Sequence, residues 1–159
     1  MRDLNVEVER LRKCIGMRSE PVVNVVEKGA VRKFAEAIGD HNAIYWDEET
    51  GKRSMHDNML APPTFPRTFD YGEIELFELP ISGLIHGEQT FTYFQTIKVG
   101  DQLACSFEVK DVSDKIGSTG RLVFVVMEQK GQSLQGEPVF SSTQTLVITE
   151  KVLEGMSKR

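Results

Sequence analysis

The sequence predicts a single α+β domain, in which helices come first and an antiparallel sheet follows. Before Pro80, apolar residues recur every three or four positions, as on one face of a helix. After Pro80, four segments with the composition of strands are separated by glycine-containing turns. The chain of 159 residues has the length of one domain and shows no repeat or linker. We therefore expect one domain over residues 1–159, with a helical extension at 1–20 and a tail at 150–159 that frays.

The first half of the chain predicts a helix, a short strand and a second helix. Apolar residues at helical spacing predict the first helix over residues 3–15, and the β-branched run PVVNVVE predicts a strand over 21–27. The second helix contains the segment VRKFAEAI and ends at Gly39, because glycine readily adopts the conformation that terminates a helix. Asp40 is therefore expected at the mouth of a loop, directly after a helix C-terminus.

Two further helices are predicted before the sheet. One begins near Asp47, because the free N–H groups of a first helical turn favour carboxylates such as those of the run DEE. The polar segment 51–58 that follows is expected to be mobile. Pro62 and Pro63 then predict a turn, and the apolar segment 65–79 predicts a buried helix.

The second half of the chain predicts a long antiparallel meander. The expected strands cover residues 83–97, 102–112, 120–130 and 138–149. In the second of these, Leu103, Cys105, Phe107 and Val109 alternate with more polar residues, as in a strand with one buried face. Cys105 is thus expected to be a small core residue.

Composition excludes several classes of function. The net charge of −5 does not favour nucleic-acid binding, and no glycine-rich phosphate loop is present. Two cysteines do not make a disulfide framework, and their spacing does not suggest zinc. The longest apolar runs are too short to cross a bilayer, and the charged start does not resemble a secretory signal. We expect a cytoplasmic protein with no membrane partner.

Three motifs carry a resemblance to a known family. FAEAIGDHNAIYWDEE, MLAPPTF and LIHGEQTFTYFQTIKVGDQL, in this order, resemble the N-terminal half of MaoC-type dehydratases, which have a hot-dog fold. They are also similar to the substrate-binding subunit of the mycobacterial (3R)-hydroxyacyl dehydratase. The resemblance covers residues 22–148 and implies a sheet wrapped around a central helix near Thr64–Leu76, with a second hot-dog subunit pairing at the sheet edge as a homodimer or heterodimer.

The resemblance also implies a reaction. MaoC-type enzymes hydrate a trans-2-enoyl thioester reversibly to a (3R)-hydroxyacyl thioester carried on coenzyme A or acyl carrier protein, without a further cofactor. Their catalytic pattern is D-x-N-P-x-H, in which the Asp and His hold the reacting water. Asp40 and Asn42 match the acid and the amide, but Tyr45 replaces the histidine. A phenol with a pKa near ~10 is a poor base at neutral pH, so Tyr45 is expected to bind water or substrate instead.

The element that binds the thioester oxygen is altered as well. In the family a glycine N–H at the start of the central helix points at this oxygen. Pro62 and Pro63 occupy the corresponding place, and proline has no N–H to donate. Thr64 is the first available donor, and Phe65 beside it is a candidate for the acyl-binding wall. Two parts of the catalytic machinery are therefore incomplete.

Each candidate residue has a simpler alternative role. Asp40 could make only local turn hydrogen bonds, and aromatic residues such as Phe65 could pack in the core. His86, in a predicted strand, is the candidate second catalytic residue, although a histidine hydrogen-bonded within the sheet is an equal alternative. His41 and His56 lie in polar loops, and the three histidines show no metal-ligand spacing.

These observations leave four functions open. The leading interpretation is a dehydratase subunit that binds the acyl thioester and depends on a partner with an intact Asp/His pair. The alternatives are a self-sufficient hydratase that uses Asp40 with His41 or His86, an acyl thioesterase, and a non-catalytic acyl-CoA binder.

Overall fold

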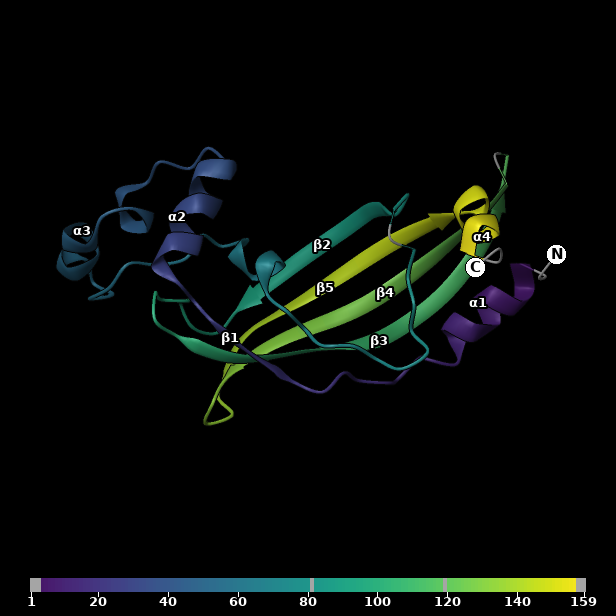
Figure 1. Cartoon of the computed structure of the whole chain (residues 1–159), viewed down its shortest axis with the longest axis horizontal. Helices are drawn as coiled ribbons and strands as arrows, with labels where there is room; N and C mark the ends of the chain where they lie inside the picture. Colours follow the sequence, from purple (N-terminus) through teal and green to yellow (C-terminus); the bar gives the residue numbers. More distant parts are fainter. Residues whose placement is uncertain (1–3, 81, 119, 157–159) are drawn as a thin grey trace.

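A computed structural model of the chain describes residues 4–80, 82–118 and 120–156. Its centre is a five-stranded antiparallel sheet with the strand order β1-β3-β4-β5-β2 (Figure 1). The strands are β1 (Val22–Val25), β2 (Ile85–Tyr93), β3 (Gln102–Gly117), β4 (Gly120–Ser133) and β5 (Pro138–Thr149). The predicted α+β class with an antiparallel sheet is confirmed.

Three of the four predicted strands form the expected meander. β3, β4 and β5 pair in sequence order, and the alternation in β3 buries Leu103, Cys105 and Val109. β2 does not precede β3 in the sheet; it pairs with β5, from Ile85↔Val147 to Tyr93↔Phe140. The chain therefore crosses from one edge of the sheet toward the other after Tyr93, and β2 and β1 are the two edge strands.

The helices gather at the two ends of the sheet (Figure 1). α1 (Leu4–Arg12) and α4 (Glu150–Met156) lie at one end, and α2 (Lys28–Ala37) and α3 (Glu48–Arg53) lie at the other. The start of the first predicted helix, at residue 3, falls outside the described residues. The tail was expected to fray, but residues 150–156 are helical because Leu153 is fully buried against the α1 end of the core.

The prediction of a central helix near Thr64–Leu76 is wrong. Only one 3-10 turn, η2 (Phe65–Thr68), forms, and no helix or strand follows it before Pro80. The Asp70 side chain accepts a hydrogen bond from the N–H of Gly72 at 2.8 Å, which closes a tight turn in place of a helical one. Gly72 has a φ of +74° and Leu76 a φ of +70°, and neither angle is compatible with a right-handed helix.

The non-helical segment is nevertheless apolar and covers the sheet. Phe69, Tyr71 and Ile74 are buried, and the segment faces Phe107 of β3 and Met127 of β4. The periodicity of apolar residues therefore predicted burial correctly but not the backbone conformation that achieves it.

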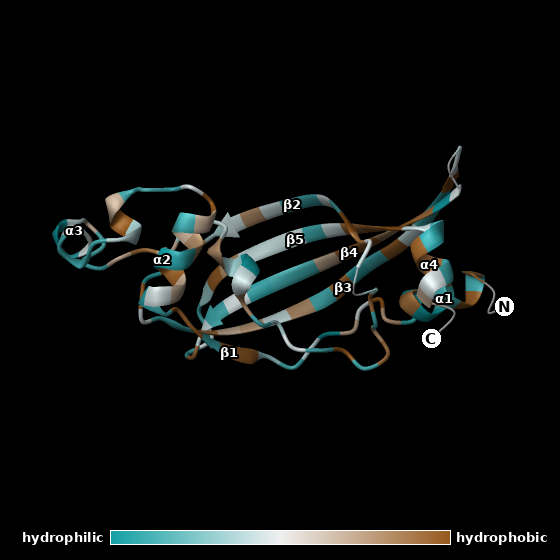
Figure 2. Cartoon of the chain, turned by 45° about the horizontal axis from the view of Figure 1, so that its top comes forward, coloured by the Kyte–Doolittle hydropathy of each residue, from teal (hydrophilic) through white to brown (hydrophobic). Residues whose placement is uncertain are grey.

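The core consists of two clusters on one continuous sheet. Figure 2 shows that hydrophobic and hydrophilic residues intermingle along the strands of this sheet. One cluster lies at the α1 and α4 end and includes Leu11, Val125 and Leu153. The other lies at the α2 end, beneath η2, and includes Val31, Phe65 and Phe140. Phe107 packs against both clusters, so the sheet connects them.

Candidate functional site

Asp40 lies where the sequence places it, directly after the C-terminus of α2. Gly39 has a φ of +70°, and the backbone N–H of Asp40 donates to the carbonyl of Ala35 at 2.9 Å, which ends the helix. Oδ1 of Asp40 accepts a hydrogen bond from the N–H of Asn42 at 3.0 Å, and the Asp40 carbonyl accepts one from Trp46 Nε1 at 3.0 Å. The carboxylate therefore makes the local turn contact expected of its simpler role, and Oδ2 has no hydrogen bond to a described residue.

Asn42 also acts locally. Its Oδ1 accepts a hydrogen bond from the N–H of Ile44 at 3.2 Å and caps the short helix η1 (Ala43–Tyr45). This cap carries the chain from Asp40 to Tyr45, so Asn42 positions the residue that stands in place of the family's histidine.

Tyr45 lines an apolar groove of about 400 Å³. The other residues that line it are Leu60, Ala61, Pro62, Pro63, Tyr93, Phe94, Gln95, Thr96 and Ile97. Partial burial, together with the nearby negative charge of Asp40, raises the pKa of the Tyr45 phenol. The ionised form of Tyr45, which alone could act as a base, is thus even scarcer at neutral pH in the folded protein than its residue type suggests.

The part of the groove that Pro62 and Pro63 line carries few hydrogen-bond donors. Pro62 and Pro63 have no N–H, and the N–H of Phe65 donates to the carbonyl of Pro62 at 2.9 Å. Tyr93 also lines the groove; its hydroxyl donates to the carbonyl of Pro63, and burial raises its pKa to about 12. Thr64, which follows the two prolines, is exposed. Its N–H donates to no described group.

Phe65 lies in the core and does not line the groove. Its side chain is 2% exposed and packs edge-on against Phe34 and Phe69, with ring centroids 5.6 and 5.5 Å apart. Among the aromatic residues it is Tyr93 and Phe94 that face the groove, together with Tyr45. The alternation of β2 alone does not distinguish these residues from core residues, since both environments are apolar.

His86 lies in a different neighbourhood from Asp40. Its Nε2 is 2.9 Å from Nη1 of Arg67 and 3.1 Å from Oε1 of Gln89, and no contact joins it to Asp40 within the chain. Arg67 was not identified from the sequence; the only available signal was a basic residue in an apolar segment.

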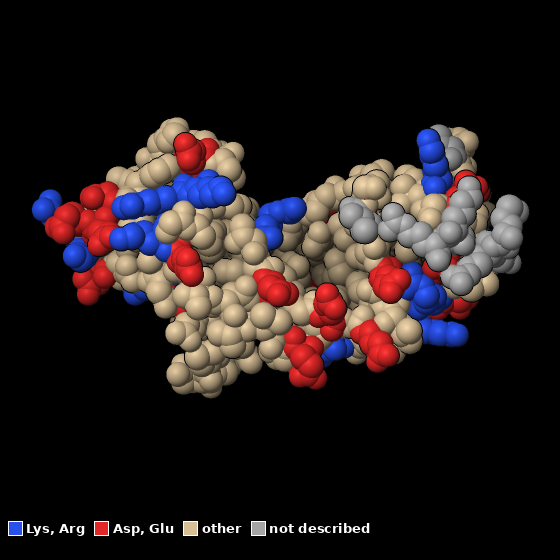
Figure 3. Space-filling view, viewed as in Figure 1, with Lys and Arg blue, Asp and Glu red and all other residues tan. Residues whose placement is uncertain are grey.

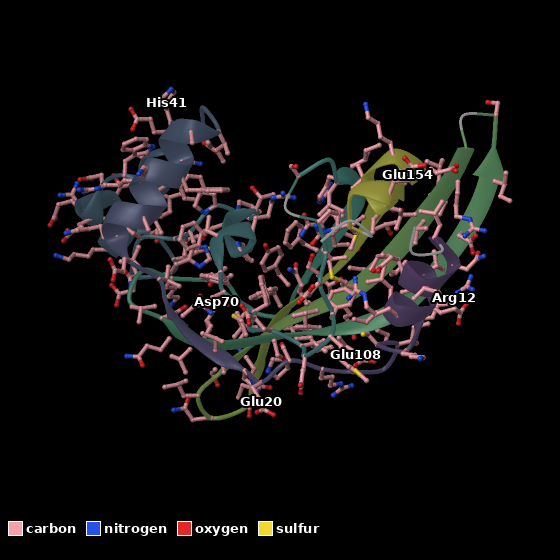
Figure 4. The ribbon with its side chains drawn as sticks, turned by 45° about the vertical axis from the view of Figure 1, so that its right-hand side comes forward. Arg12, Glu20, His41, Asp70, Glu108 and Glu154 are labelled. Carbon is pink, nitrogen blue, oxygen red and sulfur yellow. The ribbon has the colours of Figure 1, made fainter. Side chains whose placement is uncertain are left out.

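The other histidines do not complete an acid/base pair with Asp40. His41 is exposed at the outer end of α2, where Figure 4 shows it pointing away from the sheet, and its ring centroid lies 6.2 Å from that of Trp46. His56 contributes its backbone carbonyl to Lys98. In the part of the chain that the structure describes, no His, Cys, Asp and Glu side chains are grouped to hold a metal ion.

Charges are mixed over the lobe that contains α2 and α3. Figure 3 shows Lys and Arg side chains there beside Asp and Glu side chains, and Lys28 pairs with Glu48. Within the described ranges, no helix is both long and apolar enough to span a membrane.

Comparison with known proteins gives consistent results. The sequence model of the family described as "FAS1-like, dehydratase domain region" matches residues 13–142. A UPF0336 protein of Parafrankia sp. (strain EAN1pec) is 34% identical over 123 residues, which are 74% of this chain and 79% of that protein.

Solved structures share the fold at lower identity. A chain of the Mycobacterium tuberculosis HadBC (3R-hydroxyacyl-ACP dehydratase) complex superposes with a TM-score of 0.68 at 22% identity, covering 85% of this chain and 97% of that one. A chain of the ChsH1-ChsH2 complex from the same organism gives a TM-score of 0.69 at 20% identity, covering 91% and 90%. These similarities confirm the predicted hot-dog fold.

Proposed function

Because this chain belongs to the FAS1-like dehydratase-region family, we propose that it is a subunit of a (3R)-hydroxyacyl thioester dehydratase. In this proposal the subunit binds the acyl thioester, and a second hot-dog chain supplies an intact Asp/His pair. The same assembly would catalyse the reverse hydration of an enoyl thioester.

The observation that carries the proposal is the state of Tyr45 in the groove wall. Dehydration requires a base that removes a proton from the carbon next to the thioester and an acid that protonates the departing hydroxyl. Asp40 can serve as one of these groups, but the phenol beside it has a raised pKa and stays protonated. Asp40 is then the one competent group of the pair. The chain therefore has the features needed for binding but lacks a complete catalytic pair.

The groove fits an acyl thioester. Its walls are mainly aliphatic and aromatic, and the polar side chains that line it are those of Tyr45, Tyr93, Gln95 and Thr96. The similar HadBC and ChsH1-ChsH2 structures are each complexes of two differently named chains, which supports a second hot-dog chain as the partner.

Binding of crotonyl-CoA to the purified chain, measured by calorimetry, tests the groove. We expect binding that Thr96→Trp weakens at least tenfold, because the indole would fill the groove that Thr96 lines. Thr143→Trp, at an exposed position of β5 outside the groove, is the matched control and should bind as the wild type does.

Three outcomes would contradict the proposal. Equal binding by both tryptophan variants would place the ligand outside the groove. Release of free thiol from crotonyl-CoA would indicate a thioesterase. Lack of binding by the wild type would remove the acyl-binding role.

A further inference from the structure

Arg67 is held in a fixed orientation by an amide and an imidazole. Its Nη1 donates to Oε1 of Gln89 and lies 2.9 Å from Nε2 of His86. Gln89 is fixed in turn, because its Nε2 donates to Oγ of Ser142 at 3.0 Å and Ser142 is only 2% exposed. The guanidinium of η2 is thereby anchored to β2 and, through Ser142, to β5.

The hydrogen bonds define which groups remain available. Nη1 of Arg67 has two hydrogens, one for Gln89 Oε1 and one for His86 Nε2. In the tautomer in which His86 Nε2 accepts from Arg67 Nη1, the imidazole carries its proton on Nδ1. Nε and Nη2 of Arg67 and Nδ1 of His86 make no hydrogen bond to a described residue. These nitrogens present several N–H donors from two adjacent exposed side chains.

The charge of Arg67 is not neutralised within the described part of the chain. Most of the other described arginines pair with carboxylates, such as Arg12 with Asp114 and Arg18 with Glu108, whereas Arg67 contacts only an imidazole and an amide. An oriented guanidinium with free N–H groups and full charge matches the geometry of a phosphate oxyanion.

The position of this cluster relative to the groove suggests the ligand. Gln89, Phe91 and Tyr93 occupy alternate positions of β2 and so share one face of the strand. Tyr93 lines the groove, Phe91 stacks on Tyr93 with ring centroids 6.1 Å apart, and Gln89 holds Arg67. Four residue-to-residue steps along the strand place Gln89 and Tyr93 ~13 Å apart. A pantetheine arm has a backbone about four peptide units long and spans ~14 Å when extended.

We propose that Arg67 and His86 bind the phosphate of a phosphopantetheine arm whose thioester lies in the groove beside Tyr45. The arm runs along Phe91, and its phosphate receives hydrogen bonds from Arg67 Nε and Nη2 and from His86 Nδ1. This assignment gives His86 a binding role. Coenzyme A and acyl carrier protein both carry this phosphate, so either can be the source of the ligand. The inference rests on the proposed function for the identity of the ligand but not for the existence of the phosphate site.

The phosphate site is tested first with inorganic phosphate alone. Titration followed by NMR should shift the imidazole resonances of His86, whereas chloride at equal ionic strength should not. Arg67→Gln should abolish the shift. Arg53→Gln, which removes an exposed arginine of α3, is the matched control and should leave it unchanged. Absence of a phosphate-specific shift in the wild type would overturn the site.

The ligand is tested with crotonyl-pantetheine and crotonyl-4′-phosphopantetheine. The phosphorylated compound should bind the wild type roughly tenfold or more tightly, and Arg67→Gln should remove this difference while leaving the unphosphorylated compound unaffected. If Arg67→Gln lost equal affinity for both compounds, or lost affinity for neither, the inference would be overturned. Comparing crotonyl-CoA with crotonyl-loaded acyl carrier protein then distinguishes the two sources.

The two proposals fail in different ways. Binding of crotonyl-pantetheine with no gain from the phosphate contradicts the inference and leaves the proposed function intact. Phosphate binding through Arg67 without binding of either thioester contradicts the proposed function and supports the site alone.

Discussion

All three tyrosines of the chain lie in surroundings that raise the pKa of the phenol. Burial is the main cause for Tyr45, Tyr71 and Tyr93, and for Tyr45 the charge of Asp40 adds to it. The hydroxyl of Tyr71 donates to the carbonyl of Pro66 at 2.7 Å, and that of Tyr93 donates to the carbonyl of Pro63. All three side chains are therefore neutral donors throughout the physiological pH range.

This environment predicts a delayed alkaline titration. Phenols in the unfolded chain ionise near pH ~10, so their burial stabilises the fold fully below that pH. The stabilisation is lost as the pH rises from 10 through the raised values, which for Tyr93 means toward about 12. Phenolate absorbance of the folded protein should show no step near pH 10, and Tyr93→Phe should remove the step near 12. A tyrosine that titrates at pH 10 or below in the folded protein would contradict this account.

For single residues, the sequence predicted where a residue lies relative to the helices better than it predicted which groups that residue contacts. Gly39 placed Asp40 at the end of a helix, because glycine at that position terminates α2. The partner of the Asp40 carboxylate, the N–H of Asn42, depends on loop geometry that residue type does not determine. Phe65 and Phe94 have the same chemistry in the sequence, yet one is buried in the core and the other lines the groove.

At the scale of elements, the segment after η2 shows where periodicity is insufficient. Its apolar spacing fits a helix, but Asp70 and Gly72 form a turn and Pro66 lies within the preceding 3-10 turn. The alternation in β3 was a safer guide, because the face that the pattern marks packs in the two core clusters. Pairing of β2 with β5 depends on contacts distant in sequence, which no local pattern encodes.

Substitution of Gly72 distinguishes the turn from a helix. A Cβ at this position would lie 2.5 Å from the carbonyl oxygen of Glu20, and the φ of +74° disfavours any L side chain. Gly72→Ala should therefore lower the free energy of unfolding by about 1–3 kcal/mol in urea denaturation. Were the segment helical, the same change would raise it by up to ~1 kcal/mol.

Gly29→Ala provides the matched control for this measurement. Gly29 lies in α2 with nothing within 4 Å of its added Cβ, so alanine there should be neutral or stabilising by up to ~1 kcal/mol. Opposite signs for Gly29→Ala and Gly72→Ala are the expected result, and a stabilising Gly72→Ala would contradict the turn.

At the scale of the whole molecule, one sheet connects the two core clusters. β3 and β5 contribute buried residues to both clusters, so destabilisation at one end should also lower the stability of the other. Trp46 is the only tryptophan and lies between α2 and α3, far along the sheet from α4 in Figure 1. Its fluorescence therefore reports on the end opposite Leu153.

Leu153→Ala tests this coupling. Leu153 is fully buried, so truncation should destabilise the fold by about 2–5 kcal/mol. We expect the midpoints from Trp46 fluorescence and from far-ultraviolet circular dichroism to fall together in urea. A fluorescence midpoint that stays in place while the dichroism midpoint falls would show that the α2 end folds independently.

The central claim for the whole molecule is that this chain binds the acyl thioester while a second chain supplies the intact Asp/His pair. Turnover of crotonyl-CoA by the purified chain tests this claim most directly. The loss of enoyl thioester absorbance should proceed no faster with the wild type than with Asp40→Asn, because Tyr45 cannot replace the missing base. Tyr45→His restores the residue of the family pattern and is the variant in which activity should first appear. Hydration by the wild type that Asp40→Asn abolishes would contradict the claim and identify the chain as a complete enzyme.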